Sequence, residues 1–241
     1  MKKFTKKFAL LLAFFAPAFA LTNAEIIAFY ELLLKPEMPN AKFSISKREQ
    51  IGNGFESVQL LIKDGEDEAS DIVFVRGDFI FPDIIDVKKK KFYRQEYELQ
   101  KIHAAKSDFE RAARAALKTE SQIIALGESK KPKIYVFSDP ECPYCQAHLA
   151  KIEDELKIYQ VNLVLTGIFG ERSFNKIAQI YTEIKSAKTD TQKLAILRKY
   201  YERKAAVPKP SKDAYNAAVA LSEKYSKLGL RSVPTTIKAE K

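Results

Sequence analysis

The sequence has few side chains that bind metals, with two cysteines and two histidines among 241 residues. Both cysteines lie in Cys142-Pro143-Tyr144-Cys145, and the histidines are His103 and His148. A structural zinc site needs four ligands, so this pair would need two more, and His148 is better interpreted as a surface or packing residue. A disulfide between residues three apart removes little entropy from the unfolded chain. The pair therefore predicts a reactive dithiol that uses no metal and no cofactor.

Long apolar runs are also missing, because no stretch after residue 20 approaches the ~20 apolar residues of a membrane helix. Residues 1–20 combine four lysines at 2–7, an apolar run at 8–15 and Ala18-Phe19-Ala20. This order is typical of a secretory signal peptide that is cleaved after Ala20, and an uncleaved N-terminal anchor is the alternative. The sequence predicts a soluble, exported protein, in a compartment where disulfides persist.

Positive charge is in moderate excess. The formal net charge is +10, and removal of the four lysines in residues 1–20 leaves +10 − 4 = +6. Lysines gather only at 88–91, beside Phe92 and Tyr93. Such a run can indicate nucleic-acid binding. We interpret it instead as a solvated junction and expect no nucleic-acid partner.

Residues 21–87 read as one helix on an antiparallel sheet. Thr22-x-x-Glu25 is a capping box before a helical run that stops at Pro36. The apolar period then becomes two, as in Val58, Leu60 and Ile62, which indicates strands. The triplet at 76–78, Arg-Gly-Asp, is a tight turn between strands rather than an adhesion motif. Residues 88–120 have helical spacing, and about 27 helical residues would span ~40 Å.

Residues 121–241 predict a second α+β unit. Strands are expected at 122–127, 133–138 and 161–169, with a helix from the cysteines to Leu156. A strand, a helix and a strand in this order form a right-handed unit with parallel strands. Residues 171–228 are helical in three pieces, broken near Thr189 and Pro208, and a short strand follows Pro234.

The position of the cysteines predicts different roles for them. Cys142 ends a strand-to-helix turn, and Pro143 suits the first helical position. Unpaired N–H groups and the helix dipole there favour the thiolate, which is the attacking species. Glu141 opposes this effect, but it is expected to turn to water. Cys145 lies one turn further on and is more shielded. We predict that Cys142 is the nucleophile and Cys145 the resolving thiol.

The stretch KIYVFSDPECPYC at 133–145, with Val-Pro at 233–234, resembles the thioredoxin fold. The architecture resembles more narrowly the periplasmic disulfide isomerase family, DsbC and DsbG. The resemblance implies a cystatin-like dimerisation domain at 21–87, a linker helix at 88–120 and a catalytic domain at 121–241 with a helical insertion at 171–228. It also implies a homodimer located in the periplasm.

The resemblance also assigns site residues. Cys142 and Cys145 match the redox pair, and Pro234 matches a cis-proline that faces it. A cis X-Pro bond costs only ~0.5–1 kcal/mol in free chains, so a packed site can impose it. Pro143, Tyr144, Val233 and Pro234 are implied to bind substrate.

Four departures from this family stand out. Val233 replaces the threonine usual before the cis-proline and is more typical of the oxidase DsbA. Val136 stands where thioredoxin and DsbA carry a buried acid, which fits the isomerase branch. DsbC has a second, structural disulfide in its insertion. This sequence has no cysteines for such a bond, and DsbG also lacks it. The chain ends seven residues after Pro234, so the final strand and helix of the fold are expected to be missing.

The resulting hypothesis is an exported enzyme that rearranges or reduces non-native disulfides in secreted proteins through Cys142 and Cys145. Its expected partners are misfolded or reduced secreted proteins and a membrane reductase like DsbD or oxidase like DsbB. The first alternative is a dimeric thiol oxidase like DsbA, which Val233 favours. The second is a non-catalytic periplasmic chaperone.

Overall fold

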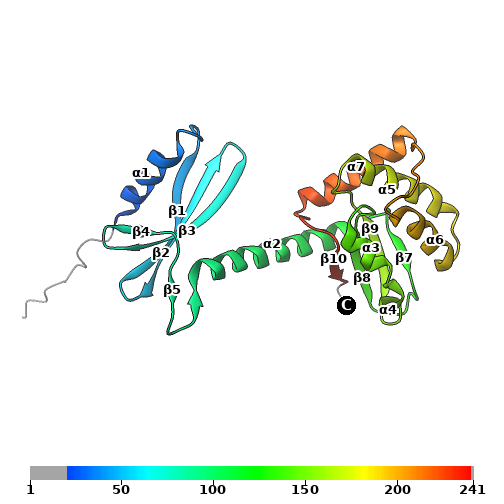
Figure 1. Cartoon of the computed structure of the whole chain (residues 1–241), viewed down its shortest axis with the longest axis horizontal. Helices are drawn as coiled ribbons and strands as arrows, with labels where there is room; N and C mark the ends of the chain where they lie inside the picture. The colour runs from blue at the N-terminus through cyan, green and yellow to red at the C-terminus, as the bar shows by residue number, and fades with distance from the viewer. Residues whose placement is uncertain (1–20, 240–241) are drawn as a thin grey trace, which may run out of the picture. The chain divides into compact units, whose positions relative to one another are not determined.

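The computed structural model describes residues 21–239, and these form two compact units that divide between Lys101 and Ile102 (Figure 1). The predicted signal peptide at 1–20 lies outside the described residues and stays a prediction. No helix among residues 21–239 is long and apolar enough to cross a membrane.

The first unit is a helix on an antiparallel sheet, as the sequence predicts. Helix α1 (Asn23–Leu34) begins at the expected capping box, in which Thr22 and Glu25 bond each other's backbone N–H groups. The sheet has the sequential order β1 (Lys42–Gly52), β2 (Phe55–Asp64), β3 (Asp67–Arg76) and β4 (Phe79–Phe81). Alternate residues of β2 and β3 bury one face around Ile26 of α1.

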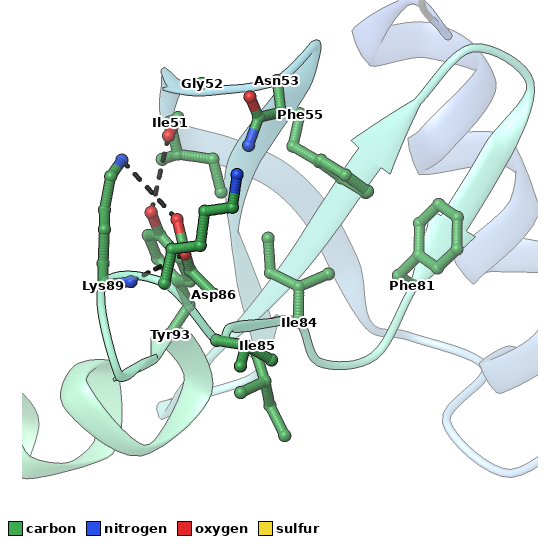
Figure 2. Close-up of a pocket in the computed structure, with 12 residues that line it drawn as sticks. Ile51, Gly52, Asn53, Phe55, Phe81, Ile84, Ile85, Asp86, Lys89 and Tyr93 are labelled. Carbon is green, nitrogen blue, oxygen red and sulfur yellow. Dashed lines mark hydrogen bonds and ion pairs between the residues drawn. The ribbon is translucent and has the colours of Figure 1, made fainter.

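A short hairpin of β5 (Ile85–Asp86) and β6 (Lys91–Phe92) closes this unit. The lysines at 88–90 form its exposed turn, which lies within the first unit and not at its boundary with the second. A pocket of about 660 Å³ lies behind the turn and is walled by apolar side chains from β1, β2, β4 and β5, as Figure 2 shows. At its rim Asp86 accepts a hydrogen bond of 2.9 Å from the backbone N–H of Lys89 and pairs with the ammonium of that lysine at 3.6 Å.

Helix α2 (Tyr93–Leu117) has 25 residues in one continuous piece. Tyr97 packs with Ile72 and Phe74 in the first unit. Phe109 and Ala113 belong to the core of the second unit. A long helix is thus present within the segment 88–120, and each of its ends makes its own apolar contacts.

The second unit has a four-stranded mixed sheet of order β10-β8-β9-β7. Its strands are β7 (Ile124–Leu126), β8 (Lys133–Ser138), β9 (Gln160–Leu165) and β10 (Thr235–Lys238). β8 and β9 are parallel, and the two outer strands are antiparallel to them. β9 is buried along its whole length, as expected for a central strand with both faces covered.

The connection from β8 to β9 corrects the predicted single helix. It consists of α3 (Pro143–Leu149) and α4 (Ile152–Leu156), with a break at Lys151, whose backbone (φ −118°, ψ 14°) leaves the helical region. Leu149 and Ile152 are both buried, and Leu156 packs against the same core. The apolar spacing continues across the break, so the sequence pattern gives no sign of it.

The segment between β9 and β10 is the helical insertion, in pieces that match the predicted breaks. It contains α5 (Glu171–Glu183), the short 3₁₀ helix η1 (Ile184–Ser186), α6 (Asp190–Tyr201) and α7 (Lys212–Lys227). Thr189 caps α6 with a capping box, and Ser211 caps α7 after the proline pair. Local polar side chains thus set where these helices begin.

Candidate active site

The cysteine pair lies in the turn from β8 to α3. Cys142 is the N-cap of α3, and Pro143 is its first residue, as the sequence predicts. The Cys142 N–H donates to the Asp139 carbonyl at 3.1 Å, and the Cys142 carbonyl accepts from Gln146 at 2.9 Å. The turn therefore fixes the backbone on both sides of the cysteine.

The segment before β10 faces this turn. The Val233–Pro234 peptide bond is cis. The Cys142 thiol donates to the Val233 carbonyl oxygen, with 3.5 Å between sulfur and oxygen. The structure thus brings together residues 91 positions apart in sequence. Tyr144, by contrast, is 77% exposed beside the pair.

The two thiols have different surroundings, although both are buried and unpaired. Cys142 is 2% exposed and Cys145 is fully buried. Burial raises the pKa of the Cys145 thiol to about 12, although the Asp139 N–H, at 3.4 Å from the sulfur, and the Ser138 hydroxyl oppose this shift. Cys145 is therefore protonated at neutral pH.

Asp139 holds the backbone around the site in place, a role that its position in the sequence does not predict. Its buried carboxylate accepts hydrogen bonds from the Ile168 N–H (2.7 Å), the Phe169 N–H (3.3 Å) and the Ser173 hydroxyl (2.9 Å). Its other oxygen accepts from the Glu141 N–H at 2.8 Å. An aspartate at a turn predicts local bonds of this last kind. Its bonds to residues about thirty positions away have no signal in the sequence.

Glu141 corrects another expectation, because its side chain does not turn to water. Its carboxylate pairs with the ammonium of Lys176 at 2.5 Å and with Arg172 at 2.9 Å. Burial opposes its ionisation, but these two cations outweigh burial and hold the pKa of Glu141 below its ordinary value. Both cations come from α5, so the insertion contributes directly to the surroundings of the cysteine turn.

Apolar side chains are exposed around the turn. Tyr144 directly precedes Cys145, and Ile168 and Phe169 are 47% and 54% exposed. The hydrogen bonds of Asp139 hold the backbone of Ile168 and Phe169 in place. This rim can contact apolar side chains of a polypeptide that approaches the cysteines.

His148 lies on α3, close to Glu155 of α4. Nε2 and the carboxylate are 3.1 Å apart, but the two groups are not aligned for a hydrogen bond. Within residues 21–239, no group of three or more histidine, cysteine or acidic side chains is arranged to hold a metal ion.

The fold and the dithiol together define the class of a thioredoxin-fold thiol–disulfide oxidoreductase. The sequence model of the thioredoxin-like domain family matches residues 119–240, and the chain belongs to this family. A search of curated proteins finds no match.

Among solved structures, the chain is similar to DsbG of Helicobacter pylori, with 21% identity and a TM-score of 0.50 over 88% of this chain and 98% of that one. ScsC of Proteus mirabilis in a transitional conformation has 18% identity and a TM-score of 0.45 over 61% of this chain and 79% of that one. A periplasmic thioredoxin-like protein of Salmonella enterica serovar Typhimurium has 19% identity and a TM-score of 0.40, over 53% and 83%. The likeness to DsbG establishes that the fold is DsbG-like.

Proposed function

We propose that this protein is exported to the periplasm, where it rearranges or reduces non-native disulfides in secreted proteins. The observation that carries the proposal is the asymmetry of the dithiol. Both thiols are buried, but Cys142 is the N-cap residue of α3, whereas burial raises the pKa of the Cys145 thiol to about 12. We therefore assign the attack on substrate to Cys142 and the later release of the mixed disulfide to Cys145.

The chemistry begins when the Cys142 thiolate attacks one sulfur of a substrate disulfide. A mixed disulfide forms, and the other substrate sulfur leaves as a thiolate. In isomerisation, a substrate thiolate attacks the mixed disulfide or a second bond, and Cys142 is finally released as a thiolate. In reduction, Cys145 loses its proton and attacks the Cys142 sulfur. The bond between Cys142 and the substrate then breaks, and the second substrate sulfur leaves as a thiolate that takes up a proton. The Cys142–Cys145 disulfide that results must receive two electrons from a reductase, for which a membrane protein like DsbD is the proposed class.

Substrate binding is proposed to use the backbone before Pro234 together with Pro143 and Tyr144. The Val233 carbonyl oxygen lies 3.5 Å from the Cys142 sulfur, so an extended peptide that bonds to this backbone would lie next to the proposed nucleophile. Backbone pairing of this kind binds peptides without strict sequence selectivity. The apolar rim of Tyr144, Ile168 and Phe169 would add contacts with unfolded chains.

Dimerisation through residues 21–87 is the third part of the proposal. A helix on a four-stranded antiparallel sheet supports the cystatin-like assignment of this segment. Its outer strands leave backbone groups that a second copy could pair with. Phe29, Leu32 and Leu33 of α1 are 47%, 80% and 58% exposed, which is typical of a surface that binds a partner.

The test combines single cysteine variants with trapping of the redox state in cells. Cys142→Ser is expected to abolish reduction and isomerisation of a scrambled substrate. Cys145→Ser is expected to accumulate mixed disulfides, because the resolving thiol is missing. Alkylation in cells should find the wild-type pair reduced. Retained activity in Cys142→Ser would refute the proposal.

The alternative of a thiol oxidase is favoured by one residue, Val233. If trapping finds the wild-type pair mostly as a disulfide, oxidation is the physiological direction, and an oxidase like DsbB is the proposed partner.

A further inference from the structure

A lysine is fully buried beside the redox turn. Lys176 of α5 has no exposed surface, and an ammonium group is costly to bury unless it is paired. Its nitrogen contacts the Glu141 carboxylate at 2.5 Å and the Glu202 carbonyl at 3.0 Å. Glu141 is the residue directly before Cys142. The buried charge is therefore tied to the neighbour of the proposed nucleophile.

A second cation completes the group. Arg172 donates from Nε to the same Glu141 oxygen at 2.9 Å and from Nη2 to the Arg203 carbonyl at 3.0 Å. Glu141, Arg172 and Lys176 together carry one net positive charge when all are ionised. Glu141 alone would disfavour a thiolate next to it, as would the buried Asp139 carboxylate of the same turn, and the two cations oppose both effects. Because the carboxylate is only 18% exposed, water screens this effect less than at an open surface.

We propose that Lys176 and Arg172 act through Glu141 as positioning residues that set the redox equilibrium of the cysteine pair. This inference rests on the proposed redox function. The net positive charge stabilises the Cys142 thiolate. That thiolate is present in the dithiol form and absent from the Cys142–Cys145 disulfide. The group therefore shifts the two-electron equilibrium toward the dithiol, the form that attacks substrate disulfides.

A purely structural role predicts something different. Lys176 bonds the Glu202 carbonyl at the end of α6, so it could serve only to fasten the insertion to the turn. If Lys176 only holds the insertion against the turn, every variant that lacks its hydrogen bond to the Glu202 carbonyl should have a less ordered site. Loss of a charge effect can be reversed by removing the opposite charge. A charge-compensating double variant therefore separates the two roles.

The experiment compares full-length wild type with Lys176→Met and with Glu141→Gln/Lys176→Met. The single variant removes one positive charge, so its equilibrium with reduced and oxidised glutathione should shift toward the disulfide by about tenfold, the order expected for one unit charge in a partly buried site. For this two-electron couple, tenfold corresponds to ~30 mV. The double variant restores the net charge carried by Arg172 and should return to within about threefold of wild type.

A second readout isolates the nucleophile. In a Cys145→Ser background, alkylation of Cys142 by iodoacetamide at a fixed neutral pH should be slower with Lys176→Met and recover in the double variant. Lys199→Met is the matched control, because Lys199 pairs with Glu183 within the same insertion and is half-exposed. It should change neither quantity. If Lys176→Met fails to fold, Arg172→Gln, at a half-exposed residue, should shift both quantities in the same direction.

Recovery of both readouts in the double variant supports the proposal. A double variant as impaired as Lys176→Met, or a Lys176→Met equilibrium equal to that of wild type, overturns it. These outcomes differ from failure of the redox function itself, in which wild type would show no exchange with glutathione that depends on Cys142.

Discussion

At the scale of single residues, the site depends on the different surroundings of two cysteine thiols that lie three positions apart in sequence. Cys145 is enclosed by the core of the second unit, where burial penalises its charge. Cys142 lies at the start of α3 and faces a backbone carbonyl. The pKa of Cys145 has a consequence for stability, because folding is linked to proton binding.

The first prediction concerns the stability of the reduced protein at alkaline pH. The pKa of Cys145 is raised from its ordinary value of 9.0 to about 12, so this thiol stabilises the fold below pH 9 and loses that contribution as pH rises toward 12. The free energy of unfolding should therefore fall above pH 9 more steeply in wild type than in Cys145→Ser. Urea denaturation under reducing conditions measures this difference. Parallel curves between pH 7 and 11 would contradict the assigned pKa.

The second prediction concerns Asp139. Asp139→Asn replaces one carboxylate oxygen with an NH₂ group, which faces N–H and hydroxyl donors that then lack an acceptor. The variant should lose about 3 kcal/mol of unfolding free energy, as expected for a broken buried network. Asp108→Asn is the control, because Asp108 is 65% exposed on α2. Equal stability of the two variants would show that Asp139 does not hold the site together.

At the scale of elements, local signals in the sequence were sufficient for most of the second unit. The predicted breaks near Thr189 and Pro208, together with the apolar period, place the helices of the insertion correctly. The break at Lys151 was missed because the apolar spacing continues across it. The contacts of Asp139 and Lys176 were missed for another reason. They join segments about thirty positions apart, and only the fold determines which segments meet.

The third prediction concerns the segment before β10. Val233 is nearly buried, and its carbonyl contacts Cys142. Val233→Thr keeps the shape of the side chain and adds a hydroxyl that can hydrogen-bond near the sulfur. We expect it to shift the pair toward the dithiol in cells and to raise isomerisation relative to oxidation. Alkylation trapping and a scrambled-substrate assay measure these effects, with Val207→Thr as the control. If both activities stay unchanged, Val233 does not tune the pair.

At the scale of the whole molecule, the chain divides its tasks between two units. The cysteines, the cis-proline and the insertion all lie in the second unit. The first unit contains neither cysteine, but it carries exposed apolar side chains on α1. This division supports separate roles for the two units in assembly and in redox chemistry.

The fourth prediction is that the mature protein is a homodimer at micromolar concentration. Leu32→Glu/Leu33→Glu places charges on the exposed face of α1, where they do not disturb the monomer. This variant should sediment as a monomer, keep simple reductase activity and lose isomerisation of scrambled substrates. Ile158→Glu, at an exposed position of the second unit, should remain dimeric. A wild-type protein that sediments as a monomer would exclude this assembly.

The ties between α5 and the cysteine turn also affect how this enzyme can be recombined with its relatives. Asp139 bonds Ser173, and Glu141 pairs with Lys176, so the turn and the insertion share one buried polar network. A chimera that receives a foreign insertion would leave these carboxylates facing unmatched side chains. A chimera that folds and keeps its activity should therefore exchange residues 139–145 and α5 together, as a single unit.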